Sequence, residues 1–197
     1  MSDSHTHSTA PGGETPENHG ATAGSAPVEP RRASTVMLLR DTLSGPEVYV
    51  QERASTMRFC AEMTVFPGGG VDSRDMPGDV DGDGVRSPEI GWQGPSTRWW
   101  AERLRTTPQM AQALVCAAVR ETFEETGTLL AGREDGTVVA DTSEYLPFRA
   151  DLENHRLAFT EFMDRHGLVL RGDLLRPWAN SVSYTHLRAH ETRRHLV

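Results

Sequence analysis

The chain has 197 residues, of which 37% are hydrophobic, and it carries a formal net charge of −8 with a pI near 5.5. This length fits one domain with tails and is sufficient to bury a substantial core. The acidic balance argues against a broad nucleic-acid surface, and no apolar run approaches the ~18 residues that a membrane helix needs. We therefore expect neither nucleic acid nor a membrane as a partner. An anionic small molecule remains possible, because a metal ion can invert the local field.

The cysteines and the N-terminus bear on the cellular compartment. Cys60 and Cys116 are isolated among apolar residues, which indicates free thiols rather than a disulfide framework. The N-terminus has no basic stretch followed by an apolar one, so no secretory signal is expected. All 20 basic residues are arginine, a bias that codon usage produces in GC-rich bacterial genes. Together these features favour a cytoplasmic bacterial protein.

The N-terminal part of the chain divides into a polar tail and a set of short strands. Residues 1–32 are rich in small and polar residues and predict a disordered tail, with order expected from Ala33. Apolar stretches separated by turn residues then predict three strands: residues 34–40, 47–52 and 63–66. The third strand runs into a turn formed by Pro and three Gly at residues 67–70.

A long helix is the strongest prediction in the second half of the chain. The irregular segment at residues 76–107 precedes it and contains a short helix around residues 99–104. Thr107 is suited to cap the long helix, Pro108 to its first position, and Gly127 to its end. Apolar residues recur between these limits at helical spacing: Met110, Leu114, Val115, Ala118, Val119 and Phe123. A strand at 128–131, a helix at 147–166 and an extended segment from 168 follow.

The C-terminal segment resembles translated adapter DNA. Residues 182–192 read Val-Ser-Tyr-Thr-His-Leu-Arg-Ala-His-Glu-Thr, which is similar to the translation of a transposase-type sequencing adapter. We expect residues 181–197 to be such an adapter translation and not native; the alternative is a natural tail rich in His and Arg. The predicted domain then covers residues 33–180, is C-terminally truncated, and contains residues 76–107 as an insertion.

Three glutamates on the long helix predict a metal site. Glu121, Glu124 and Glu125 lie at positions i, i+3 and i+4, which share one helical face at ~3.6 residues per turn. Carboxylates this close repel one another unless a cation lies between them, and Mg²⁺ or Mn²⁺ prefers such oxygen ligands. The alternative is a solvated acidic helix face, which accounts less well for the helix-ending Gly127 and for the preceding Pro-Gly-Gly turn.

These residues resemble the Nudix box. The box runs Gly, five residues, Glu, seven residues, Arg-Glu-U-x-Glu-Glu-x-Gly-U, where U is apolar. Gly69 matches the first Gly, and Asp75 stands in place of the first Glu. The second half matches at Arg120, Glu121, Glu124, Glu125 and Gly127, while Thr122 and Thr128 occupy the U positions. The two halves are separated by residues 76–119, and a long loop insertion of this kind costs little closure entropy.

The interruption and a second motif resemble the coenzyme A diphosphatase branch of the Nudix hydrolases. That branch carries Arg-Ser/Ala, three residues, Arg, three residues, Gly, three residues, Phe-Pro-Gly-Gly before the box. Arg53, Arg58 and the Phe-Pro-Gly-Gly at residues 66–69 match it, whereas Glu62 replaces the Gly. Two arginines beside an acidic metal site can hold phosphates; exposed charge at a strand end is the alternative for both.

The resemblance implies an α/β Nudix fold, a mixed β-sheet sandwiched between α-helices, and hydrolysis of a diphosphate linkage in coenzyme A or acyl-coenzyme A. It implies Mg²⁺ or Mn²⁺ held by Glu121, Glu124, Glu125 and Gly69, and Glu121 or Glu124 as the base. Arg120 belongs to the catalytic group as the side chain that orients these carboxylates, and Arg53, Arg58 and Gly68 bind substrate. Alternatives are another nucleoside diphosphate derivative, such as ADP-ribose or a dinucleotide, or a non-catalytic nucleotide-binding module. The oligomeric state is left open.

Overall fold

The computed structural model describes residues 31–52, 63–76, 78 and 90–180. Nearly all of the predicted N-terminal tail, the predicted adapter segment and residues 79–89 of the predicted insertion therefore lie outside the described residues. The described strands and helices are β1 (Ala33–Thr35), β2 (Leu39–Thr42), β3 (Gly45–Val48), β4 (Gln51–Glu52), β5 (Thr64–Val65), β6 (Gly68–Gly70), β7 (Gly91–Gln93), α1 (Thr97–Leu104), α2 (Pro108–Thr126), β8 (Ala131–Gly132), α3 (Arg149–Glu153), α4 (Phe159–Arg165) and β9 (Val169–Arg171). Three short 3₁₀ turns are η1 (Ser73–Asp75), η2 (Leu146–Phe148) and η3 (Gly172–Leu174).

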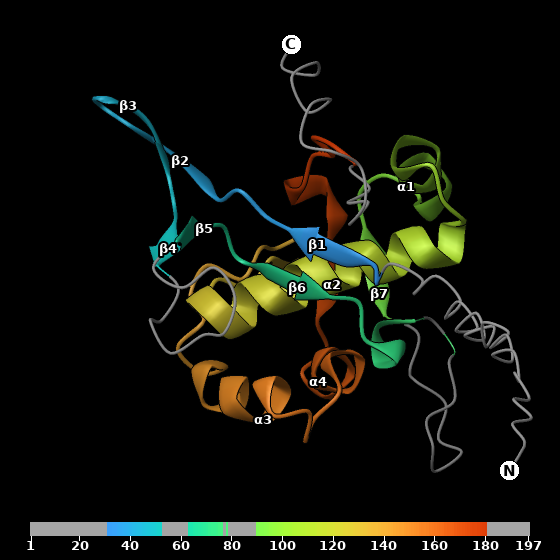
Figure 1. The fold of residues 1–197 in the computed structure, drawn as a ribbon. Helices are drawn as coiled ribbons and strands as arrows, with labels where there is room; N and C mark the ends of the chain where they lie inside the picture. The colour runs from blue at the N-terminus through green and yellow to red at the C-terminus, as the bar shows by residue number, and fades with distance from the viewer. Residues whose placement is uncertain (1–30, 53–62, 77, 79–89, 181–197) are drawn as a thin grey trace, which may run out of the picture.

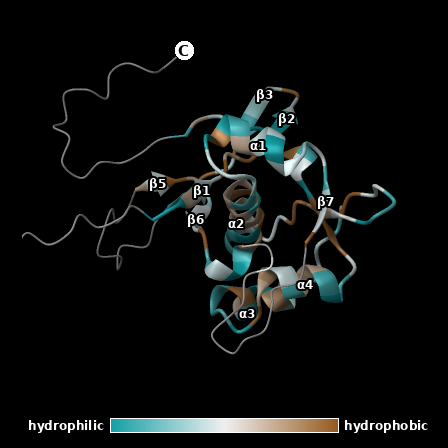
Figure 2. Cartoon of the chain, turned by 90° about the vertical axis from the view of Figure 1, so that its right-hand side faces the viewer, coloured by the Kyte–Doolittle hydropathy of each residue, from teal (hydrophilic) through white to brown (hydrophobic). Residues whose placement is uncertain are grey.

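Helix α2 lies at the centre of the described structure (Figure 1). Seen nearly end-on, it has β1 and β6 on one side, β7 on the other, and helices α1, α3 and α4 around it (Figure 2). The buried residues of α2 occupy most of its circumference, from Ala111 to Glu124. A helix that is apolar on most sides needs neighbours on most sides, which explains its central position.

The ends of α2 are where the sequence predicts them. The Thr107 side chain accepts a hydrogen bond from the Met110 amide at 3.2 Å, and Pro108 occupies the first turn. Gly127 ends the helix in the left-handed conformation at φ 77°, where a residue with a side chain would be strained. The predicted long helix is therefore confirmed at both termini.

The strands form small sheets. β1 pairs with β6, β2 with β3, and β4 with β5, each antiparallel, while β9 lies between a parallel β7 and an antiparallel β8. The α/β class and a mixed sheet are as predicted. The single larger sheet between helices is not seen in the described part of the chain. Instead α2 lies between the β1–β6 pair and the three-stranded sheet, because its buried residues lie on both sides of the helix and must be shielded from water on both.

Several predicted elements differ from the observed ones. The strand predicted at 34–40 is divided into β1 and β2, that at 47–52 into β3 and β4, and the strand predicted at 128–131 is β8. Residues 67–70 were expected to form a turn, but Gly68–Gly70 pairs in register with Ala33–Thr35 as β6. The absence of a side chain permits this approach, since a Cβ at Gly68 would collide with the backbone of Ser34. The predicted helix at 147–166 is two helices, α3 and α4, because the chain turns at His155, whose φ is +57°.

An aromatic cluster fixes the C-terminal half of α2 against α3 and α4. The Phe162 ring of α4 stacks on Phe123 of α2, with centroids 5.6 Å apart. The rings of Tyr145 and Phe148 lie 5.8 and 5.7 Å from the same Phe162 ring. Packing of this kind contributes beyond simple area burial, so the last turns of α2 are held firmly in place. No helix within the described ranges is both long and apolar enough to cross a membrane.

We expect Thr107→Ala to lower the free energy of unfolding by about 1 kcal/mol, because the first turn of α2 loses its side-chain cap. Urea denaturation followed by circular dichroism measures the effect. Thr106→Ala is the matched control, since Thr106 precedes the capping residue and lies outside α2, and its effect should stay within about 0.5 kcal/mol. Equal losses in the two variants would contradict the capping role.

Candidate active site

The buried guanidinium of Arg120 joins the two separated halves of the predicted box. Its Nε donates to Asp75 Oδ1 at 3.0 Å and its Nη2 to Asp75 Oδ2 at 2.9 Å. The side chains of Arg120 and Asp75 are only 7% and 2% exposed. Nη2 also donates to the Gly70 carbonyl at 2.8 Å. A two-point pair of this kind fixes both position and orientation, so the turn after β6 is locked onto α2.

The turn η1 holds Asp75 ready for this contact. Asp72 caps the turn by accepting a hydrogen bond from the Arg74 amide at 2.9 Å, and Asp75 Oδ2 accepts one from the Asp72 amide at 2.9 Å. Arg74 donates from Nη2 to Asp72 at 2.7 Å, which holds the pKa of that carboxyl well below its usual range. The buried Cys116 thiol lies 3.7 Å from Asp75 Oδ1, and burial raises its pKa.

The three glutamates predicted to bind metal do not share the same partners: Glu121 and Glu124 contact Arg120, whereas Glu125 does not. Glu121 Oε1 accepts a hydrogen bond from Arg120 Nη1 at 2.9 Å, and Glu124 is reached by the same nitrogen at 3.3 Å. Glu125 points elsewhere: its Oε2 accepts from the Gly68 amide at 3.0 Å and from Gln51 Nε2 at 2.7 Å. Across the described ranges, no three acidic, histidine or cysteine side chains converge as ligands of a metal ion. The described structure therefore brings Glu121 and Glu124 together at Arg120 but turns Glu125 toward Gly68 and Gln51, and the metal site stays a prediction.

Burial and like charge shape the protonation of this acidic cluster. Burial raises the pKa of Glu124 to about 7, with the Arg120 charge opposing and the Glu121 charge adding to the rise. Burial likewise raises the pKa of Glu121 against the opposing effect of Arg120. Burial alone would lower the pKa of Arg120, but its hydrogen bond and attraction to Asp75 outweigh this and raise it. The cluster thus gathers more carboxylate than one guanidinium neutralises.

The donor set fits a hard divalent cation in chemistry and in charge. Carboxylate oxygens are the ligands that Mg²⁺ and Mn²⁺ prefer, and an excess of negative charge at a partly buried site favours a cation. The backbone of Gly69 lies directly against the Glu121 carboxylate, since a Cβ at Gly69 would overlap it. Gly69 is therefore a neighbour of Glu121, and Glu121 and Glu124 share the Nη1 group of Arg120.

Of the three residues predicted to bind substrate, the structure describes Gly68. Arg53 and Arg58 lie outside the described residues. The Gly68 amide, predicted to face substrate, instead donates to the Glu125 carboxylate. Gly68 is thereby placed beside the acidic cluster.

Two contacts of the cluster, Gln51 and Arg149, escaped the sequence prediction of the site. Asp75 was matched to the first acid of the box but given no role, and the structure shows it as the main partner of Arg120. Gln51 gave no signal, because a glutamine at a strand end is ordinary. Arg149, which donates to the Glu124 backbone carbonyl, is far along the chain in a separate helix. Tertiary contacts alone reveal the last two.

Thr122, which departs from the apolar pattern of the box, is fully buried without an unmet polar group. Its hydroxyl donates to the Ala118 carbonyl at 2.7 Å within the helix. A buried hydroxyl that is hydrogen-bonded avoids the desolvation penalty of an unpaired one. The threonine is therefore compatible with the packed face of α2.

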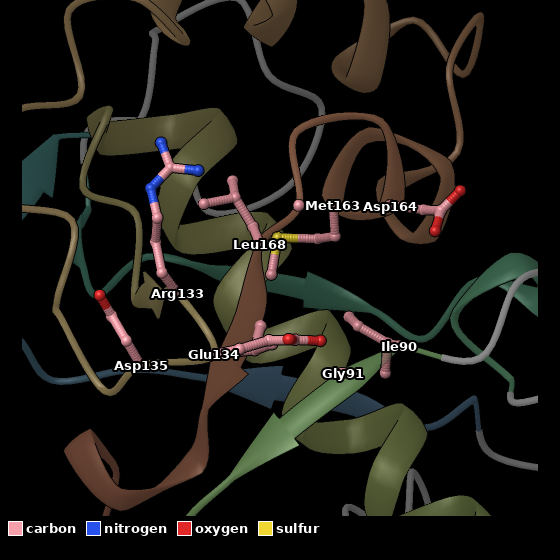
Figure 3. Close-up of a pocket in the computed structure, with 10 residues that line it drawn as sticks. Ile90, Gly91, Arg133, Glu134, Asp135, Met163, Asp164 and Leu168 are labelled. Atoms are coloured by element: carbon pink, nitrogen blue, oxygen red, sulfur yellow. The ribbon is translucent and has the colours of Figure 1, made fainter.

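A pocket of about 630 Å³ lies apart from the acidic cluster, and no residue of that cluster lines it. Ile90, Met163 and Leu168 give it an apolar part, and Figure 3 shows the Met163 and Leu168 side chains next to each other. Three carboxylates also line it: Glu134, Asp135 and Asp164. The one lining arginine, Arg133, already donates to the His166 carbonyl and the Tyr145 hydroxyl. Because this arginine is already engaged and none of the lining residues belongs to the box, the pocket is the poorer candidate for diphosphate chemistry.

We expect Asp75→Asn to destabilise the fold by about 3 kcal/mol, because it leaves the buried Arg120 charge without its main partner. Urea denaturation measures the loss. Asp173→Asn is the control, since Asp173 pairs with Arg171 but is 37% exposed, and its loss should stay below about 1 kcal/mol. A loss for Asp75→Asn no larger than that of the control would contradict a structural role for the pair.

Comparison with known proteins supplies one structural relative. No family model matches the chain, and no curated protein sequence is significantly similar to it. The structure is similar to the crystal structure of a NUDIX hydrolase from Alicyclobacillus acidocaldarius, with a TM-score of 0.52 and 27% identity. The match covers 74% of this chain and 59% of that one, so the chain spans about three-fifths of the relative's length. The described fold is thus that of a mixed α/β protein similar to a Nudix hydrolase.

Proposed function

We propose that this chain is a metal-dependent Nudix hydrolase that cleaves the diphosphate linkage of coenzyme A or an acyl-coenzyme A. The observation that carries the proposal is the Arg120 assembly. One guanidinium holds Asp75 and Gly70 from the first half of the box and Glu121 and Glu124 from the second. The similarity to a solved Nudix hydrolase supports the same reaction class.

In the proposed mechanism, the side chains Glu121, Glu124 and Glu125 and the backbone of Gly69 would hold Mg²⁺ or Mn²⁺. The bound metal would neutralise charge on the phosphoryl oxygens and acidify the attacking water. Arg120 restrains Glu121 and Glu124 on one edge of α2, so that their carboxylates need little reorganisation. Either Glu121 or Glu124 accepts the proton of the attacking water.

Glu125 is held by partners other than Arg120. The Gly68 amide and the Gln51 amide group both donate to its Oε2. Because Gly68 opens β6, this contact ties the strand to the last turn of α2 that carries the glutamate. Although its amide is engaged by Glu125, we keep Gly68 on the substrate side of the site, because its backbone lies beside that glutamate. A phosphate lying at the glutamates would also face this glycine backbone.

The coenzyme A preference rests on sequence features. The motif around Arg53 and Arg58, together with the insertion between the halves of the box, is similar to the coenzyme A diphosphatase branch. Two arginines beside an acidic metal site suit the phosphates of a nucleotide-type ligand. Another nucleoside diphosphate derivative, such as ADP-ribose, would use the same chemistry. A non-catalytic binding module is disfavoured, because all three helix glutamates are present.

We expect Glu124→Gln to lower Mg²⁺-dependent turnover at least about 100-fold, since the glutamate either binds metal or accepts a proton. Turnover is measured as release of 4'-phosphopantetheine from coenzyme A by mass spectrometry. Glu153→Gln, which changes an exposed glutamate of α3, is the matched control and should behave like the parent. Unchanged turnover in Glu124→Gln would show that the metal-site assignment is wrong.

A substrate panel tests the coenzyme A preference. With Mg²⁺ or Mn²⁺ present, we expect kcat/KM for coenzyme A to exceed that for ADP-ribose and for dinucleotides. The reason is that the arginine motif before the box resembles that of coenzyme A diphosphatases. Cleavage of ADP-ribose alone would overturn the substrate but leave the chemistry standing. Nucleotide binding without hydrolysis of any of these compounds would favour the non-catalytic module.

A further inference from the structure

The last turn of α2 has backbone carbonyls without partners inside the helix. The Gly127 amide closes the helix by donating to the Phe123 carbonyl at 2.9 Å. In a continuing helix the next amide, that of Thr128, would donate to the Glu124 carbonyl. Here the Thr128 amide donates to the Thr126 hydroxyl instead, at 3.0 Å. The Glu124 carbonyl therefore needs a donor from elsewhere.

Arg149 of α3 supplies that donor. Its Nε and Nη2 both donate to the Glu124 carbonyl, at 3.1 and 2.6 Å. Its guanidinium also lies against Gly127, with Nη1 3.6 Å from the place of a Cβ on that glycine. A cation at a helix C-terminus interacts favourably with the partial negative charge of the terminal carbonyls. Arg149 thus caps the helix both by hydrogen bonding and by charge.

The helix that carries Arg149 is itself held in place. Leu152 of α3 is 1% exposed within the core. Phe148, the residue before Arg149, packs against Phe162, which in turn stacks on Phe123 of α2. The arginine is consequently presented to the end of α2 from a packed element, and its position is determined by the same aromatic cluster.

We propose that Arg149 is a positioning residue for the acidic site, a role that rests on the proposed function. Arg149 donates to the backbone carbonyl of Glu124, whose side chain contacts Arg120. The next residue, Glu125, accepts hydrogen bonds from Gly68 and Gln51. Releasing the carbonyl would let this last turn fray, which would spread the directions of both carboxylates. Arg149 therefore raises the affinity of the site for a divalent cation without contacting it.

A simple helix cap would have a different signature. It would change the midpoint of unfolding but leave metal affinity intact in the folded protein. The positioning role changes metal affinity at temperatures where the variant is fully folded. It also changes the opening of the last turn, which amide hydrogen exchange detects without any metal.

The test uses the full chain and four variants: Arg149→Gln, Arg149→Lys, Glu124→Gln and Arg156→Gln. Arg156→Gln is the matched control, because Arg156 also donates to a backbone carbonyl, that of Ala150, but outside α2. Binding of Mn²⁺ alone is titrated by electron paramagnetic resonance at a temperature where circular dichroism shows every variant folded. Amide exchange of residues 123–128 is measured on the metal-free proteins.

We expect Arg149→Gln to weaken Mn²⁺ binding about 10-fold, as loss of a residue that orients a ligand commonly does. Its amides at residues 123–128 should exchange faster, Arg149→Lys should restore part of both effects, and Arg156→Gln should match the parent. Parent-like Mn²⁺ affinity in Arg149→Gln, beside loss of binding in Glu124→Gln, would overturn the positioning role and leave the proposed function standing. Absence of Glu124-dependent Mn²⁺ binding in the parent would overturn both.

Discussion

The buried pair of Arg120 and Asp75 is the interaction on which the candidate site depends. Two charges withdrawn from water are stable only if nearly all of their hydrogen-bonding capacity is used. Arg120 meets this condition through Asp75, Gly70, Glu121 and Glu124, and these partners come from both halves of the interrupted box. The desolvation cost therefore forces the turn η1, the end of β6 and the helix α2 into one arrangement.

The central position of α2 explains why its glutamates lie together beside β6. Its apolar residues are covered by strands on two sides and by helices elsewhere, which leaves its acidic edge beside β6. The glycines of β6 allow the strand to approach both β1 and Glu121 more closely than side chains would permit. Contacts from Gly68 and Gln51 to Glu125, and from Arg149 to Glu124, then restrain the same turn from separate directions. The glutamate side chains at the end of α2 are thus held by a packed surrounding structure.

The negative charge of these glutamates connects the structure to the proposed reaction. Burial works against ionisation of Glu121 and Glu124, and a single guanidinium compensates only part of the repulsion. A divalent cation bound by these oxygens would relieve the imbalance and attract an anionic phosphate group despite the acidic chain. The pocket between β7, β9 and α4 also has more carboxylates than arginines, but none of the residues that line it belongs to either half of the box. The acidic edge of α2 is accordingly the better candidate for diphosphate chemistry.

The sequence by itself determined the features that depend on neighbouring residues. Thr107, Pro108 and Gly127 define α2 through local capping, and helical spacing alone places Glu121, Glu124 and Glu125 on one face. Only the tertiary structure decided the partners of those glutamates, because Gln51, Gly68 and Arg149 reach them across long stretches of chain. Pairing likewise made a strand of Gly68–Gly70, and the turn at His155 divided the predicted helix into α3 and α4. Local propensities carry no information about which distant backbone or charge will meet a side chain, whereas packing and desolvation select that partner in the folded protein.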